Sequence, residues 1–163
     1  MLMLFCGIPA SGKTTIANEV AKRLTLKAIH IQSDIIRHMI PKPIHNNIED
    51  EVVYNAMNSL AKIALEFNYL VILDATFLRH ERREQALSIA KGLGKKSLLI
   101  HVKCSLDAAI TRNRMRETLI PEKIIKEINE FFEESLDALE IDSERISVKK
   151  AAELILGKMR DNI

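Results

Sequence analysis

The chain has 163 residues, of which 47% are hydrophobic and 28% are charged, and its formal net charge is +2. These values are ordinary for one globular domain with its own core, and so small a net charge neither demands nor excludes a nucleic-acid partner. No apolar run approaches the roughly 18 residues of a membrane span, and no basic leader with an apolar core opens the chain, so neither a membrane span nor a signal peptide is expected.

Apolar runs alternate with segments of helical periodicity along the whole chain. Strands are expected at residues 1–6, 27–32, 69–73, 97–103 and 137–141. Helices are expected at residues 14–24, 35–40, 51–68, 81–91, 106–117, 121–134 and 148–160. The alternation predicts a single α/β domain over residues 1–163, with a parallel sheet covered by helices on both faces. Ligands of such sheets bind at the carboxyl ends of the strands.

The first expected strand runs directly into Gly-Ile-Pro-Ala-Ser-Gly-Lys-Thr, residues 7–14. This stretch matches G-x-x-x-x-G-K-[ST], the phosphate-binding P-loop. Its glycines let the backbone turn tightly, so that successive N–H groups and the positive end of the next helix face an anion. Lys13 is expected to reach the β- and γ-phosphates of a nucleotide, and the Thr14 hydroxyl to bind Mg²⁺. The expected nucleotide-binding residues are Gly7, Pro9, Ala10, Ser11, Gly12, Lys13, Thr14 and Thr15.

Carboxylates, hydroxyls and arginines follow the next three expected strands. Because the carboxyl ends of parallel strands meet at one edge of the sheet, these residues are expected to gather near the P-loop. The residues are Asp34 and Arg37 after the second strand, Asp74, Thr76 and Arg79 after the third, and Arg112, Arg114 and Arg116 beyond the fourth.

Each of these residues also has a simpler interpretation. Asp34 could be only a helix N-cap, and Asp74 only a turn residue at the end of a strand. The arginines of segment 112–116 could form an exposed helix face. The P-loop weakens these alternatives, because it places all of the positions at the mouth of one phosphate site.

Phosphoryl transfer gives each position a chemical role. The transition state spreads negative charge over the moving phosphoryl group, and the attacking hydroxyl needs an acceptor for its proton. Asp34 is the candidate base, and Arg37, three residues later on the same helix face, is expected to hold the substrate beside it. Asp74 is expected to bind Mg²⁺ directly or through water. Thr76 and Arg79 are further candidates for contacting the substrate.

Together these residues resemble a small P-loop kinase of the adenylate-kinase-like class. The resemblance is closest to the AAA-type ATP-binding branch that contains polynucleotide 5′-hydroxyl kinases and zeta-toxin-like kinases. Where polynucleotide kinases typically have Asn after the Thr of the third-strand motif, this chain has Phe77. The matching segments are G-I-P-A-S-G-K-T-T (7–15), S-D-I-I-R (33–37), L-D-A-T-F-L-R (73–79), residues 112–116 and residues 120–125.

The resemblance implies a three-layer αβα P-loop NTPase fold with a five-stranded parallel sheet in the order 2-3-1-4-5. It implies that Asp34 is the general base and Arg37 a substrate-site residue. It also implies a mobile lid over about 112–120, in which Arg112 contacts the nucleotide and Arg116 the transferring phosphate. Residues 142–148 would lie near the adenine, and an acceptor-binding element would occupy about 38–68.

The resulting hypothesis is a kinase that uses ATP and Mg²⁺ to phosphorylate a hydroxyl acceptor. The acceptor is left open between a polynucleotide 5′-hydroxyl end, a nucleoside or nucleotide, and a small sugar-like molecule, and the protein is expected to be a monomer or a homodimer. One alternative is a regulatory NTPase module without an acceptor, and another is a toxin-type kinase of a nucleotide sugar. The D-x-x-R pair formed by Asp34 and Arg37 favours a kinase, because a bare NTPase does not need it.

Other residues have less specific interpretations. Arg79, Arg82 and Arg83, with the lysines at 91, 95 and 96, form a basic region that is either a nucleic-acid contact or a solvated helix end. Phe131 and Phe132 are expected in the core. Cys6 and Cys104 lie at the ends of expected strands and are expected to be buried free thiols, consistent with a reducing, cytoplasmic compartment.

Overall fold

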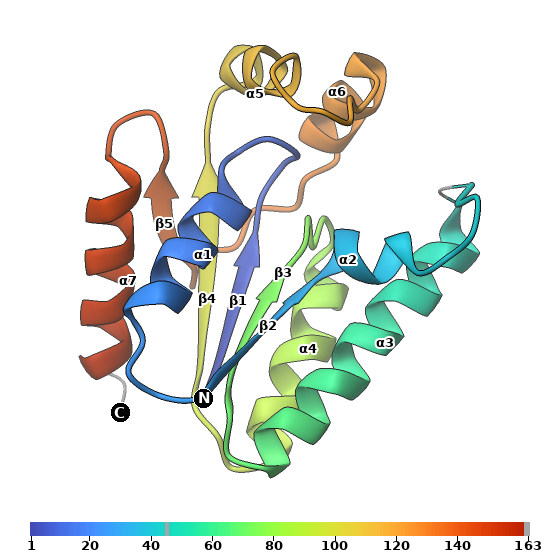
Figure 1. Cartoon of the computed structure of the whole chain (residues 1–163). Helices are drawn as coiled ribbons and strands as arrows, with labels where there is room; N and C mark the ends of the chain where they lie inside the picture. The colour runs from blue at the N-terminus through green and yellow to red at the C-terminus, as the bar shows by residue number, and fades with distance from the viewer. Residues whose placement is uncertain (45, 162–163) are drawn as a thin grey trace.

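The computed structural model describes residues 1–44 and 46–161, so His45 of the expected acceptor-binding element lies outside the described residues. A parallel sheet in the order β2-β3-β1-β4-β5 forms the middle layer, with helices on both faces (Figure 1). The strands are β1 Leu2–Cys6, β2 Ala28–Gln32, β3 Leu70–Asp74, β4 Ser97–Lys103 and β5 Leu139–Asp142. The helices are α1 Lys13–Arg23, α2 Ser33–His38, α3 Asn47–Glu66, α4 His80–Gly92, α5 Leu106–Asn113, α6 Glu122–Glu130 and α7 Val148–Asp161.

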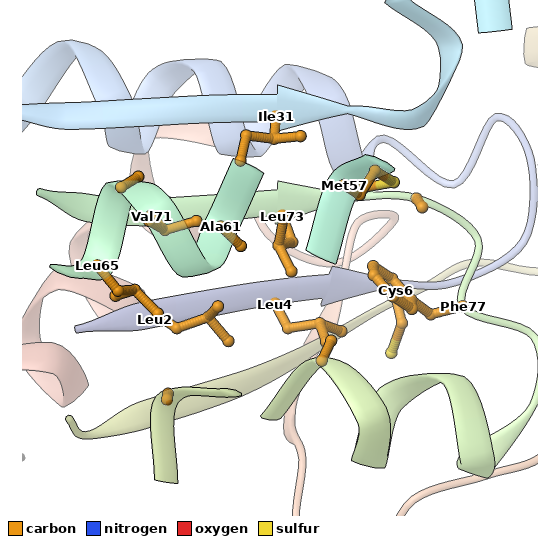
Figure 2. Close-up of a cluster of buried hydrophobic side chains, with 14 of the residues drawn as sticks. Leu2, Leu4, Cys6, Ile31, Met57, Ala61, Leu65, Val71, Leu73 and Phe77 are labelled. Atoms are coloured by element: carbon orange, nitrogen blue, oxygen red, sulfur yellow. The ribbon is translucent and has the colours of Figure 1, made fainter. Parts of the chain in front are cut away.

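The central strands β1 and β3 are buried along their whole length. Both of their faces are covered, which is why their sequences are continuous apolar runs without alternation. Helices α3 and α4 cover one face, where Leu4 and Leu73 pack with Met57 and other apolar side chains (Figure 2). Helices α1 and α7 cover the other face around Phe5 and Ile155. The fold and strand order expected from the sequence are therefore confirmed.

Helices α5 and α6 stand over the carboxyl ends of the strands (Figure 1). A small apolar cluster of Ile8, Ala109 and Ile125 fastens them to the loop that follows β1. Because Ile8 belongs to the P-loop, this cluster sets the position of α5 and of the segment beyond it relative to the phosphate-binding residues.

Several boundaries differ from the expected ones. Helix α3 begins at Asn47 rather than at residue 51, because the Asn46 side chain caps it by accepting a hydrogen bond from the Glu49 N–H at 2.9 Å. Helix α5 ends at Asn113 rather than at residue 117, and α6 ends at Glu130 rather than at residue 134. The expected lid is therefore mostly an irregular segment between two short helices.

Two expectations about burial are only partly correct. Cys6 is buried, but Cys104 is half-buried, and both thiols are free. Phe132 packs against the core, whereas Phe131 is largely exposed because α6 ends just before it.

Within the described residues, no helix combines the length and apolar character needed to cross a bilayer.

Candidate active site

The P-loop connects β1 to α1 with a backbone that is left-handed at Ala10 and Gly12, at φ of 60° and 99°. Gly7 has φ of 142°, and a Cβ atom there would lie only 2.3 Å from the carbonyl oxygen of Val102. The α1 N-cap, Gly12, offers no side-chain acceptor, and the first turn of α1 contains no acidic residue. No side chain of the described residues caps the first N–H groups of α1, so these groups are available to bind an anion.

Lys13 is buried within this loop. Its Nζ donates to the carbonyl oxygen of Ile8 at 2.8 Å and lies 3.5 Å from the Ser11 Oγ. Burial lowers the pKa of the Lys13 ammonium group, while the nearby Asp74 carboxylate acts in the opposite direction. The structure therefore places a poorly hydrated lysine side chain within the phosphate-binding loop.

Asp74 ends β3 and is buried at the bottom of the same cleft. Its Oδ2 has no hydrogen-bond partner among the described residues and lies 3.4 Å from Nε2 of His30 on β2. Thr14 lines the cleft as well. A buried carboxylate oxygen without a donor, together with a hydroxyl, suits a hard cation such as Mg²⁺, so these residues fit the metal that phosphoryl transfer needs. Nothing in the sequence pattern had linked His30 to Asp74.

Arg112 connects the P-loop to the segment after β5. Its Nη1 donates to the Ser143 Oγ at 2.8 Å and to the Ser11 carbonyl oxygen at 3.3 Å, and its Nη2 donates to the Ser143 carbonyl oxygen at 3.1 Å. Ser143 lines the P-loop cleft together with Ile146 and Val148. The segment that the resemblance assigned to the adenine therefore forms a wall of this cleft.

The two ends of the expected lid segment are joined by Asn113, a buried residue for which the sequence pattern indicated no role. Its Nδ2 donates to the Ile120 carbonyl oxygen at 2.8 Å, and its Oδ1 accepts from the Ile120 N–H at 3.1 Å. Both ends of the loop over 114–119 are thus pinned by one amide. Within the loop, Arg114 pairs with Glu122 at 2.7 Å on the exposed side, so the three lid arginines have different surroundings.

Two clefts meet beside the P-loop. The first has a volume of about 510 Å³ and contains the P-loop, Asp74 and Arg112, and the second has a volume of about 1210 Å³ and is bounded by α2, α3, α4 and the lid segment. Asp34 and Arg116 line both clefts, and the Arg116 Nη2 lies 3.8 Å from the Asp34 Oδ2. Asp34 is inside α2 rather than at its N-cap, which is Gln32, so the capping interpretation is wrong.

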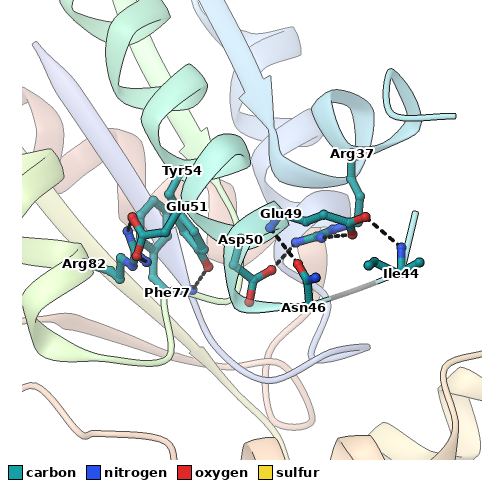
Figure 3. Close-up of polar contacts among 9 residues, drawn as sticks. All are labelled: Arg37, Ile44, Asn46, Glu49, Asp50, Glu51, Tyr54, Phe77 and Arg82. Carbon is teal, nitrogen blue, oxygen red and sulfur yellow. Dashed lines mark hydrogen bonds and ion pairs between the residues drawn. The ribbon is translucent and has the colours of Figure 1, made fainter. Parts of the chain in front are cut away.

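Arg37 lines the larger cleft but is held by carboxylates of α3 (Figure 3). Its Nη2 contacts the Asp50 Oδ1 at 2.5 Å, and its Nη1 lies 3.6 Å from the Glu49 Oε2. From the sequence we expected Arg37 to hold the substrate beside Asp34. In the structure Arg37 also joins α2 to α3, because the early start of α3 brings two acids to it.

Phe77 turns inward where the loop after β3 passes the larger cleft. It is buried with φ of 45°, its ring centroid lies 5.2 Å from that of Tyr54, and its N–H donates to the Tyr54 hydroxyl at 3.2 Å (Figure 3). Burial raises the pKa of Tyr54 to about 12, so the phenol stays neutral. With Phe77 turned into the core, Thr76 and Arg79 are left lining the cleft.

Arg83 does not belong to a surface basic region, contrary to that expectation. It is entirely buried, and its guanidinium donates to the carbonyl oxygens of Phe77 at 2.8 Å and Glu133 at 2.6 Å. Arg82, by contrast, is paired with Glu51 at the rim of the larger cleft and lies over the Tyr54 ring (Figure 3). The two neighbouring arginines therefore have different roles, and their positions in α4 decide which one is buried.

His101 has an acidic neighbour that its sequence context did not indicate. It is buried on β4, stacks on Phe132 and lies 3.3 Å from the Glu134 Oε2, with Glu140 close by. Burial lowers the pKa of the His101 imidazole. Lys103 already pairs with both Glu134 and Glu140, at 3.6 Å and 3.1 Å, so these acids form an ion-pair cluster away from the two clefts.

Comparisons with known proteins find a matching family, a related sequence and similar folds. A family model described as AAA domain matches residues 2–135. The L-seryl-tRNA(Sec) kinase of Methanococcus maripaludis is 30% identical over 136 residues, which are 82% of this chain and 52% of the relative, so the chain spans about half the length of that protein.

Two solved structures show the same fold at low sequence identity. The Mycobacterium tuberculosis APS kinase CysC in complex with AMPPNP and APS matches with a TM-score of 0.80 and 16% identity, covering 98% of this chain and 96% of that one. Chaetomium thermophilum Kti12 in complex with ADP-AlF3 matches with a TM-score of 0.80 and 18% identity, covering 100% and 99%.

Proposed function

The chain belongs to the AAA domain family, and from that premise we propose that it is a kinase that transfers the γ-phosphoryl group of ATP to a hydroxyl acceptor. The resemblance to small P-loop kinases expected from the sequence is confirmed by the family match and by the fold. The observation that carries the proposal is the junction of the two clefts, where Asp34 and Arg116 line both. A phosphoryl group passing from one ligand to another needs such a junction.

The smaller cleft is the proposed ATP site. The P-loop N–H groups and Lys13 bind the phosphates, and residues 142–148 border the adenine. Arg112 holds this border against the P-loop through Ser143 and Ser11. Thr14 and Asp74 would hold Mg²⁺, which when bound neutralises charge on the β- and γ-phosphates. We propose a reducing, cytoplasmic compartment for the reaction, with which the two free thiols are consistent.

The larger cleft is the proposed acceptor site. The Asp34 carboxylate accepts the proton of the attacking hydroxyl, whose oxygen forms the new P–O bond as the bond to the β-phosphate oxygen breaks. Arg116, now close to Asp34, approaches the transferring phosphoryl group when residues 112–120 close as a lid. Thr76 and Arg79 contact the acceptor, and Arg37 shapes its site from the ion pair with Asp50. Residues 38–68 form the acceptor-binding element.

The size of the larger cleft favours an acceptor bigger than a simple sugar. Its volume of about 1210 Å³ is more than twice that of the ATP cleft, and residues of α3, α4 and the lid segment line it. The curated relative is a kinase that is named for a tRNA substrate. We therefore favour a hydroxyl carried at the end of an RNA, and nucleosides and sugars are the smaller alternatives.

An acceptor screen with labelled ATP tests the function. The expected result is transfer to an RNA-borne hydroxyl, with seryl-tRNA and 5′-hydroxyl RNA tested beside nucleosides, nucleotide sugars and free sugars. ATP consumption at a rate that no acceptor changes would instead support an NTPase module, and transfer only to a nucleotide sugar would support a toxin-type kinase.

Replacement of Asp34 by asparagine tests the mechanism. We expect the transfer rate to fall by about 10²- to 10⁴-fold, the usual contribution of a general base, with the ATP Kd changed less than about threefold. The control is Asp107→Asn, the same chemical change at an exposed residue of α5 that lines neither cleft, and it should leave the transfer rate unchanged. A near-normal rate for the Asp34 variant would show that Asp34 is not the base.

A further inference from the structure

The outer face of α3 carries a stripe of exposed apolar side chains that the two clefts do not use. Five large side chains on this helix and its C-cap residue are about half exposed or more: Ile48 at 73%, Val52 at 54%, Leu60 at 48%, Ile63 at 53% and the C-cap Phe67 at 74%. Their spacing of three or four residues, or multiples of it, places them along one side of the helix. The residues of α3 that line the acceptor cleft are different ones, namely Asn47, Asp50, Glu51 and Tyr54.

This stripe is separate from the face that α3 packs on the sheet. Val53, Met57 and Ala61 are buried against β1 and β3, together with Ala64 and Leu65. The helix is therefore apolar on two adjacent faces, of which only one has a partner among the described residues. Helix α3 is also the outermost element on its side of the molecule, beside the edge strand β2 (Figure 1). A second molecule can reach the stripe along its whole length.

The exposed area is large enough to need an explanation. The five side chains expose roughly 500 Å² of apolar surface, which is as large as the largest apolar patches on monomeric proteins. Packing this surface against an identical one would remove roughly 1,000 Å² from water, the size at which specific protein interfaces begin. The stripe alone thus reaches the lower limit for a stable pair, before any neighbouring surface is added.

The pattern of large and small residues selects the partner. Along the stripe, large side chains stand at both ends, and the small residues Ala56 and Ser59 stand in the middle. Ile48 and Phe67, and likewise Val52 and Ile63, stand at equal distances from its centre, whereas the counterpart of Leu60 is Asn55. Two antiparallel copies would therefore match large residues with large ones and let the backbones approach where the residues are small. This self-complementarity is the property of a two-fold interface between identical subunits.

We propose that the outer face of α3 is a homodimer interface, in which two copies of this chain pack their α3 helices antiparallel around a two-fold axis near Ala56 and Ser59. In this arrangement Val52 of one copy lies opposite Ile63 of the other. Each acceptor cleft opens beside the N-terminal end of its own α3, so both clefts stay accessible in the dimer.

The association state of the full chain tests the proposal. Sedimentation velocity over a concentration range of about 1 to 200 µM is expected to show a dimer. Ile63→Glu should raise the dissociation constant of this dimer by about 100-fold or more, because each interface would bury two unpaired carboxylates. The matched control is Leu154→Glu, a change at an exposed apolar residue of α7, which should leave the dimer intact. Circular dichroism and ATP affinity would show that both variants are folded.

Chemical cross-linking tests the antiparallel arrangement. In a Cys104→Ser background, Ala56→Cys lies near the axis and should be joined to its counterpart by a short bismaleimide, whereas Glu66→Cys, at the end of the helix, should not. A chain that is monomeric at all concentrations, or an Ile63→Glu variant that dimerises like the unmodified chain, would overturn the proposal. Equal cross-linking at both positions would overturn the antiparallel arrangement.

Discussion

Replacing Arg83 with methionine is expected to lower the free energy of unfolding by about 2 to 4 kcal/mol. Arg83 is entirely buried, and its side chain joins the loop after β3 to the segment after α6 through the carbonyl oxygens of Phe77 and Glu133. The guanidinium also lies 5.5 Å from the centroid of the Phe132 ring. Methionine can fill most of the space but cannot donate to either carbonyl group.

The magnitude follows from those contacts. The two close hydrogen bonds, at 2.8 Å and 2.6 Å, come from a charged donor, and each such bond contributes about 1.5 to 3 kcal/mol. Their loss would cost about 3 to 6 kcal/mol, and removing the buried charge returns part of this because its desolvation penalty disappears. The net loss is large beside a total stability of about 5 to 15 kcal/mol.

Equilibrium unfolding in urea at pH 7, followed by circular dichroism, measures the effect. The expected result is a lower midpoint with an unchanged slope, and the transfer rate should also fall because the loop that carries Thr76 and Arg79 is released. The control is Arg82→Met, which removes a rim ion pair and should cost less than about 1 kcal/mol. An Arg83→Met midpoint equal to that of the unmodified chain would refute the reasoning.

Three further predictions concern the P-loop and the thiols. Gly7→Ala should lower the free energy of unfolding by more than about 2 kcal/mol and abolish ATP binding, because the new Cβ would meet the Val102 carbonyl oxygen. The control is Gly157→Ala in α7, where a Cβ meets no atom within 4 Å, and this change should leave the thermal stability unchanged or raise it. Arg112→Lys should raise the ATP Kd about tenfold in calorimetry, because lysine cannot bridge Ser11 and Ser143, while Arg114→Lys should not. Burial raises the pKa of Cys6 from 9.0 to about 11. The buried thiol therefore contributes fully to stability below pH 9, and the free energy of unfolding should fall by about 2 to 3 kcal/mol as the pH rises to 11. Urea midpoints of Cys6→Ala should lack that part of the pH dependence, and at pH 8 a thiol reagent should modify Cys104 while Cys6 reacts only after unfolding.

The amino-acid sequence was sufficient for features that depend on neighbouring residues. The P-loop is one contiguous segment, so its match predicted the tight turn and the helix that follows. Continuous apolar runs predicted the covered strands β1 and β3, because only a strand buried on both faces needs apolar residues at every position. Alternation of strands and helices predicted a parallel sheet, and the family resemblance implied its strand order. The positions of Asp34 and Asp74 just after expected strands predicted that both lie beside the P-loop.

Tertiary structure decided the features that join distant parts of the chain. Arg82 and Arg83 are neighbours in the sequence, yet one pairs at the rim of a cleft and the other is buried, because the packing of α4 gives them different surroundings. Arg37 is held by acids of α3, and Arg112 by Ser143, through contacts that no local pattern records. Periodicity and motifs describe the local backbone, whereas these pairings arise only when packed helices bring separate segments within hydrogen-bond distance.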